Sequence, residues 1–189
     1  VIGSSDSHNA TSPSDEKGYT GKLPMMDGSA GLRTGAAGLA LDKLTPARQW
    51  DSGGLAGVWA PENTREALFD ALQRRETFAT SGSRMRIRFF GGDLPEDVAA
   101  QNDPIALAYE RGVPMGSDLP VNGAPRFWVW AVQDPAGPPL DRIQIVKGWV
   151  DADSNPAEKV YDVAWSDDRT AGDDGKLPPV GDTVDLSIP

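Results

Sequence analysis

The sequence contains no cysteine and only one histidine, His8, among its 189 residues. Without cysteine the chain forms no disulfide, holds no metal through thiolates and has no cysteine nucleophile. Any chemistry that needs an imidazole therefore depends on His8. The lack of cysteine leaves the compartment open, because reducing and oxidising environments both tolerate such a chain.

Long apolar runs and excess positive charge are also missing. No stretch approaches the ~20 apolar residues of a membrane-spanning helix, so we expect a soluble protein, periplasmic or cytoplasmic. The chain has 18 Lys and Arg against 28 Asp and Glu, a net charge of -10. Because this charge repels nucleic acid and anionic membranes, we expect neither as a partner.

What is present indicates a folded chain rich in turns. Six Trp, five Phe and three Tyr supply a core, and the length suits one fair-sized domain or two small ones. The 21 Gly and 16 Pro predict many turns, with more strand and loop than helix.

One helix is predicted over residues 64–75. Asn63 is the expected N-cap, Glu66 follows three positions later, and apolar residues recur at helical spacing. Arg74 and Arg75 fall in the last turn, where we expect solvated side chains.

A strand follows, and its alternation predicts two unlike faces. Met85, Ile87 and Phe89 are expected to face the core, and the arginines at 84, 86 and 88 to form a cationic face. After residue 91 short strands are predicted between turn clusters, at 106–109, 126–132, 142–150, 160–165 and 183–188. This pattern is typical of an antiparallel sandwich.

Four tryptophans lie on these later strands, at 128, 130, 149 and 165. We expect all four in the core, since the strand 126–132 is apolar on both faces and should be buried. The alternative is a stacking platform for sugar rings or another ligand.

The segment Gly3–Asn9 contains the strongest candidate for metal chemistry. Asp6 and His8 form an Asp-x-His step that follows an apolar strand, and this step aims a carboxylate and an imidazole at one point. The same residues also suit an ordinary loop, because Asp, Ser and Asn side chains bond their own backbone in turns.

Four separated segments resemble a bacterial family catalogued as domain of unknown function 3604: residues 3–9, 57–67, 74–84 and 142–149. That family is similar to the polymerase-and-histidinol-phosphatase (PHP) superfamily, whose distorted barrels hold two or three divalent metals. The resemblance implies an α+β fold, in which residues 1–91 form the end of a PHP-like α/β barrel and residues 92–189 a β-sandwich-like region.

The resemblance also implies a set of functional residues. Asp6 and His8 match a metal-binding Asp-x-His step, with Asn9 orienting the ligand loop. The metal is zinc, manganese or iron, and it activates a water for attack on a phosphoryl or carbonyl group. Because two ligands leave a divalent ion incompletely bound, we expect a C-terminal fragment that is inactive alone and needs the remainder of its parent chain.

Arg84 is the candidate for binding a small anionic substrate. Its guanidinium follows Ser81 and Ser83, so a two-bond grip on an anionic oxygen can be supplemented by the loop amides. The alternative is a strand-end arginine paired with surface acids. The sequence thus predicts part of a metal-dependent, phosphoesterase-like hydrolase, and the rival is a non-catalytic β-sandwich binding or interaction module.

Overall fold

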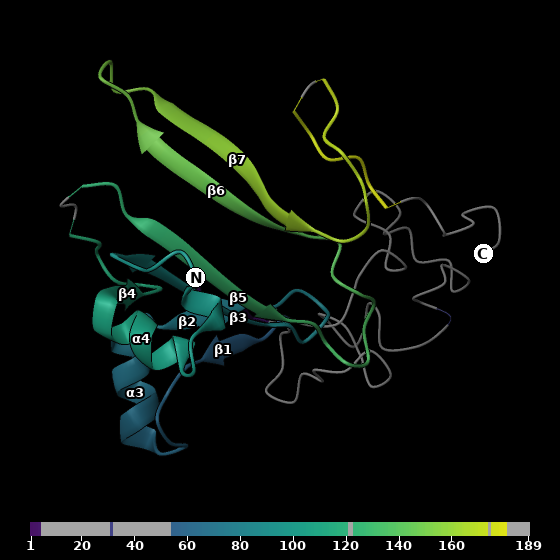
Figure 1. The fold of residues 1–189 in the computed structure, drawn as a ribbon. Helices are drawn as coiled ribbons and strands as arrows, with labels where there is room; N and C mark the ends of the chain where they lie inside the picture. The colour runs from purple at the N-terminus through teal and green to yellow at the C-terminus, as the bar shows by residue number, and fades with distance from the viewer. Residues whose placement is uncertain (5–30, 32–53, 121–122, 174, 181–189) are drawn as a thin grey trace. The chain divides into compact units, whose positions relative to one another are not determined.

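The computed structural model describes residues 1–4, 31, 54–120, 123–173 and 175–180. The chain divides into two compact units, Val1–Gly137 and Pro138–Pro189 (Figure 1). The division predicted near residue 91 falls inside a strand, because β3 (Arg86–Gly92) runs through that point and pairs with strands on both sides.

The first unit contains a two-stranded sheet whose strands are separated in the chain by a helix. Strand β1 (Ala56–Val58) pairs antiparallel with β2 (Thr77–Ala79), and helix α3 (Arg65–Gln73) lies between them in the chain. The predicted helix is thus confirmed, but its N-cap is Thr64 rather than Asn63. The Thr64 hydroxyl accepts a hydrogen bond from the Ala67 amide at 3.3 Å.

Helix α3 ends in a Schellman motif built without glycine. The Glu76 amide donates to the Ala71 carbonyl at 3.1 Å, and the Arg75 amide donates to the Leu72 carbonyl at 3.0 Å. Arg75 adopts a positive φ of 61°, the left-handed conformation that this motif requires. Both Arg74 and Arg75 are exposed, as the sequence predicted.

A three-stranded antiparallel sheet forms the centre of the first unit, in the order β4-β3-β5. Strand β5 (Arg126–Val132) pairs with β3 along its whole length, and β4 (Gly112–Pro114) pairs with the end of β3. The core lies on one face of this sheet. Phe90, only 1% exposed, packs with Leu94 and Ala108, and Trp128 stacks on its ring at 5.8 Å.

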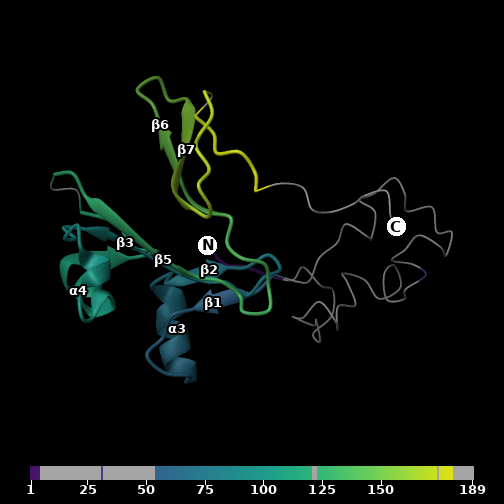
Figure 2. The ribbon, with the colours of Figure 1, turned by 45° about the vertical axis from the view of Figure 1, so that its right-hand side comes forward.

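Residues 106–109 belong to helix α4 (Pro104–Arg111), so the strand predicted there is wrong. The Asp103 side chain accepts from the Ala106 amide at 2.9 Å, and Pro104 occupies the first helical position, where its missing N–H costs nothing. These capping residues outweigh the short apolar run. In Figures 1 and 2, α4 lies against the sheet of β3 and β5, preceded by the short 3₁₀ helix η2 (Val98–Ala100).

The two faces of β3 differ from the sequence prediction. Met85, expected in the core, is exposed, whereas Arg88 is only 14% exposed. Alternation places Arg88 on the same face of β3 as Phe90. The face that was predicted to be cationic therefore packs on the core. The opposite face holds Phe89, whose ring stacks on Phe127 at 5.4 Å.

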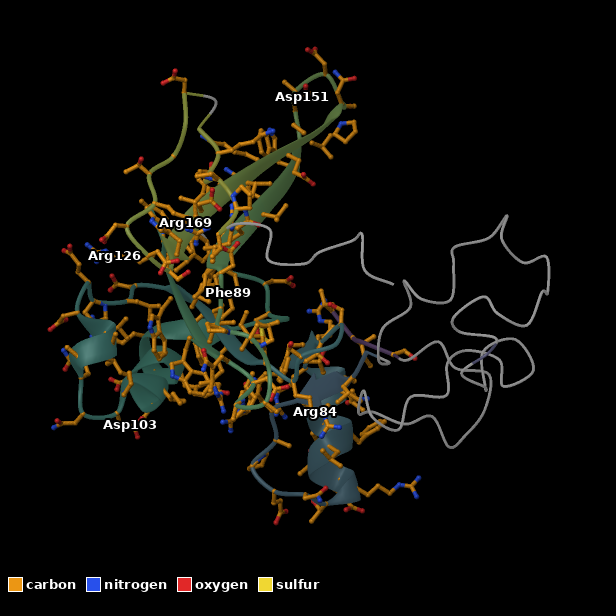
Figure 3. The ribbon with its side chains drawn as sticks, turned by 90° about the vertical axis from the view of Figure 1, so that its right-hand side faces the viewer. Arg84, Phe89, Asp103, Arg126, Asp151 and Arg169 are labelled. Atoms are coloured by element: carbon orange, nitrogen blue, oxygen red, sulfur yellow. The ribbon has the colours of Figure 1, made fainter. Side chains whose placement is uncertain are left out.

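The second unit is a long hairpin with a following loop. Strands β6 (Arg142–Val150) and β7 (Pro156–Trp165) pair antiparallel, and Asp151 lies in the turn at the tip (Figure 3). Two arginines hold the loop to the base of the hairpin. Arg142 donates to the Leu177 carbonyl at 2.9 Å, and Arg169 donates to the Pro178 carbonyl at 2.9 Å.

The structure therefore has a mixed helix-and-strand character with antiparallel sheets, which agrees with the coarse α+β expectation. Strands 126–132, 142–150 and 160–165 are confirmed, and 183–188 lie outside the described residues. The described parts contain one three-stranded and two two-stranded antiparallel sheets. Within them, no helix has the length and apolar character needed to cross a membrane.

Candidate functional site

The first four residues run beside β2. The Thr77 hydroxyl donates to the Val1 carbonyl at 2.7 Å, at the start of the strand. Ser4, at the other end of this segment, lies close to Gly54. A Cβ added at Gly54 would lie 2.8 Å from the Ser4 carbonyl oxygen and 2.6 Å from the Thr80 carbonyl oxygen. The backbones of Ser4 and Thr80 thus both border Gly54. Ser4 stands two residues before Asp6 in the sequence.

Thr80 also begins the turn that carries the predicted substrate-binding residues. Its amide donates to the Leu55 carbonyl at 3.0 Å, and its hydroxyl accepts from the Leu55 amide at 3.2 Å. Gly82 has a φ of 121°, which an L side chain rarely adopts. The turn is therefore fixed at its start by Leu55, the residue before β1, and shaped at its centre by Gly82.

Asp134 fixes the other end of this turn. Its carboxylate accepts hydrogen bonds from the Arg84 amide at 2.7 Å and the Ala136 amide at 2.9 Å. The bond from Arg84 is the main reason that the pKa of Asp134 is lowered, followed by the bond from Ala136. Asp134 is therefore a carboxylate at neutral pH, and it holds the residue on which the predicted anion grip depends.

The structure places the predicted site residues in two groups. Ser81 and Arg84 are exposed and Ser83 is half-buried, and all three lie in the segment between β2 and β3. Figure 3 labels Arg84. Asp6, His8 and Asn9 lie outside the described residues. One expectation about the turn changes: the Arg84 amide already donates to Asp134, so this amide is not a free donor for an anion.

A second polar cluster was missed by the sequence analysis. Glu76, 4% exposed, accepts a hydrogen bond from the Tyr109 phenol, and Arg88 donates to the same phenol at 3.1 Å. Arg88 also lies 4.0 Å from the Glu76 carboxylate, and Arg74 lies 3.6 Å from it. Burial, and then the bond to Glu76, raise the pKa of Tyr109.

Trp59 completes this cluster. The guanidinium carbon of Arg88 lies 3.6 Å from the ring centroid, a close cation–π contact, and the indole N–H donates to the Ile87 carbonyl at 2.9 Å. The arginine is thus held between a ring and a phenol. The cluster joins α4 to β2 and β3, and its partners are too far apart in sequence for any local pattern to reveal them.

Metal ligation receives no direct evidence from the described residues. Among them, no three His, Cys, Asp or Glu side chains come together closely enough to hold a metal ion. The predicted ligands Asp6 and His8 are not among these residues, so the metal assignment stays a prediction.

The described residues define a mixed α+β protein with short antiparallel sheets. A family model described as "Protein of unknown function (DUF3604)" matches residues 1–188, so the chain belongs to that family. This confirms the family resemblance of the four sequence segments, while similarity to the PHP superfamily stays a prediction. No curated protein and no solved structure gives a significant match.

Proposed function

We propose that the chain is the C-terminal part of a metal-dependent hydrolase of phosphoesterase type. The position of Ser4 is the supporting observation, because it borders Gly54 beside the first residue of the Thr80–Arg84 turn. A peptide chain spans at most about 3.6 Å per residue, so Asp6 can lie no further than about 7 Å from Ser4. The proposal therefore brings the Asp-x-His step and the turn into one site.

The donors fit a divalent metal in type but not in number. A carboxylate and a neutral imidazole suit zinc, manganese or iron, and Asp6 with His8 supplies one of each. Two ligands leave such an ion incompletely bound, so the proposal takes the others from the rest of a longer parent chain. When bound, the metal would lower the pKa of a water and polarise the scissile group.

The turn supplies the substrate contacts in this proposal. The Arg84 guanidinium donates two parallel hydrogen bonds to two oxygens of an anionic substrate group, and the hydroxyls of Ser81 and Ser83 donate further ones. Asp134 holds the Arg84 backbone in place, so less freedom is lost when the substrate binds. Asn9 orients the loop that carries the two metal ligands.

Metal binding by the 189-residue chain tests the ligand assignment. Equilibrium dialysis with Mn²⁺ or Zn²⁺ should show weak binding that Asp6→Asn and His8→Ala each abolish, because each removes one of two donors. Folded His8→Ala protein that binds as much metal as the unsubstituted chain would refute the assignment.

Measurements of hydrolysis test two other parts of the proposal, the incomplete metal site and the role of Arg84. The 189-residue chain should not hydrolyse p-nitrophenyl phosphate, and activity that His8→Ala removes would contradict an incomplete site. In the longer parent, Arg84→Ala should weaken the binding of an anionic substrate by about 1.5–3 kcal/mol, the range for a hydrogen bond to a charged group. Arg86→Ala is the matched control, because Arg86 is also exposed and lies two residues further along. Equal losses of substrate affinity in both variants would show that Arg84 has no specific role in substrate binding.

A further inference from the structure

One face of the β6–β7 hairpin carries two lysines directly opposite each other. Lys147 pairs with Lys159 in the register, with Trp149 opposite Ala157 on one side and Ile145 opposite Tyr161 on the other. Because side chains alternate along a strand, all six of these residues share a face. We call this set the lysine–aromatic face.

The lysine pair is unfavourable for the sheet by itself. Like charges directly opposite each other repel, and among the described residues neither lysine forms an ion pair with an acid. Each ammonium instead lies near a ring: Lys147 Nζ is 5.3 Å from the Trp149 centroid, and Lys159 Nζ is 4.8 Å from that of Tyr161. An anionic ligand would relieve this repulsion.

The two rings also leave apolar surface open. Trp149 is 41% exposed and Tyr161 is 39% exposed, although large aromatic side chains contribute most when they are covered. The face thus offers two similar units, each an ammonium next to an open ring. A matching ligand carries negative charge and an apolar surface on the same residue, and repeats both.

We propose that the lysine–aromatic face binds a linear polysaccharide of uronic acids. Each carboxylate accepts a hydrogen bond from a lysine, while the C–H surface of the same sugar packs on the neighbouring ring. The chain's net charge of -10 makes this cationic face a local exception, so charge complementarity favours an anionic ligand here over other surfaces.

Other anionic partners fit less well. Backbone groups of the hairpin bond to each other within the plane of the sheet, and Lys and Trp side chains are donors without acceptors. The N–H groups of an acidic peptide lying on this face would therefore have few partners. Anionic membranes are typically bound by clusters of roughly four to eight basic residues, and this face has two.

Isothermal titration of the 189-residue chain with polygalacturonate is the direct test. Lys147→Gln and Lys159→Gln should each weaken binding about threefold, and the double variant about tenfold, the range for exposed charge pairs. Trp149→Ala should weaken it about fivefold. Arg65→Gln is the control, because it removes one positive charge at an exposed residue of α3 and should leave the affinity unchanged.

Added salt should weaken the interaction, and dextran, a neutral polysaccharide, should not bind. Circular dichroism should show that the lysine variants fold, since removing one ammonium relieves repulsion. If a lysine variant does not fold, the pair Lys147→Arg and Lys159→Arg serves instead, and retained affinity supports the proposal.

Three results would overturn the inference. The first is no binding of polygalacturonate, or binding that the double lysine variant leaves unchanged. The second is equally tight binding of poly-glutamate that survives Trp149→Ala, which would indicate a simple charge effect. The third is capture by phosphatidylserine vesicles without binding of polygalacturonate.

Discussion

The Tyr109 phenol donates a hydrogen bond to the buried carboxylate of Glu76, and these residues stand 33 positions apart in the chain. The contact joins helix α4 to the residue that precedes β2. Arg88, stacked on Trp59, donates to the same phenol and lies near the same carboxylate. Glu76 thus has a neutral donor and a cation nearby, which is the condition under which a carboxylate can be buried.

Tyr109→Phe should destabilise the protein by about 1.5–3 kcal/mol, because the buried carboxylate loses a hydrogen bond and nothing replaces it. Urea denaturation measures this change. Tyr161→Phe is the matched control, since its hydroxyl has no hydrogen bond within the described part of the chain, and it should change stability by less than about 0.5 kcal/mol. Similar effects of both substitutions would show that the Glu76 contact is not a stabilising one.

Alkaline titration should report the raised pKa of Tyr109. Burial and the bond to Glu76 raise its pKa above the ordinary 10.0, so the folded state favours the neutral phenol. The resulting stability is complete below pH 10 and is lost as pH rises through the folded-state pKa. Phenolate absorbance should show a component above pH 10 that Tyr109→Phe removes. A titration that is identical in the variant would contradict the raised pKa.

Arg75→Gly should stabilise the protein by about 0.5–1 kcal/mol. Arg75 holds a φ of 61° at the end of α3, where glycine avoids the steric cost of a Cβ. Thermal unfolding gives the measurement. Arg74→Gly is the adjacent control: its backbone is right-handed and its side chain lies near Glu76, so this change should destabilise. Stabilisation by both would point to a general effect of removing charge.

Gly116→Ala should cost more than about 2 kcal/mol. Its φ is 88°, and an added Cβ would lie 2.3 Å from the Arg75 carbonyl oxygen, which is backbone and cannot rotate away. Gly123→Ala isolates the conformational part, because Gly123 has a φ of 105° with open space around it. It should cost only about 1 kcal/mol. Equal costs at the two sites would mean that the loop around Gly116 moves away from α3.

The Arg84 amide should report the ionisation of Asp134. Its hydrogen bond to that carboxylate is the main cause of the lowered pKa, so the bond persists as pH falls to 3.8 and is lost only below it. The stability it supplies is present above the unfolded pKa and is lost as pH falls through the folded one. The NMR shift of the Arg84 amide should follow this titration. Asp134→Asn should abolish it, and a shift that persists would place the responsible acid elsewhere.

Local patterns were sufficient for some elements and not for others. Helix α3 follows from apolar periodicity and is confirmed, with its N-cap displaced by one residue, and strand β5 follows from an apolar run between turn clusters and is confirmed. The strand predicted at 106–109 is wrong although the deciding signal is local: Asp103 and Pro104 form a helix start, which outweighs the four-residue apolar run. The expectation that the tryptophans lie in the core holds for Trp128, which packs against it, and is wrong for Trp149 and Trp165, which are exposed.

The sequence by itself determined that no thiol chemistry is possible, that one histidine carries any imidazole chemistry, and that the chain belongs with the family its four segments resemble. Only the tertiary structure decided where Arg88 lies. Alternation gave β3 two faces, but which face is buried depends on Trp59, Glu76 and Tyr109, residues that the fold brings together from distant segments. A guanidinium can be buried only where such partners offset its loss of water, and no local pattern contains them.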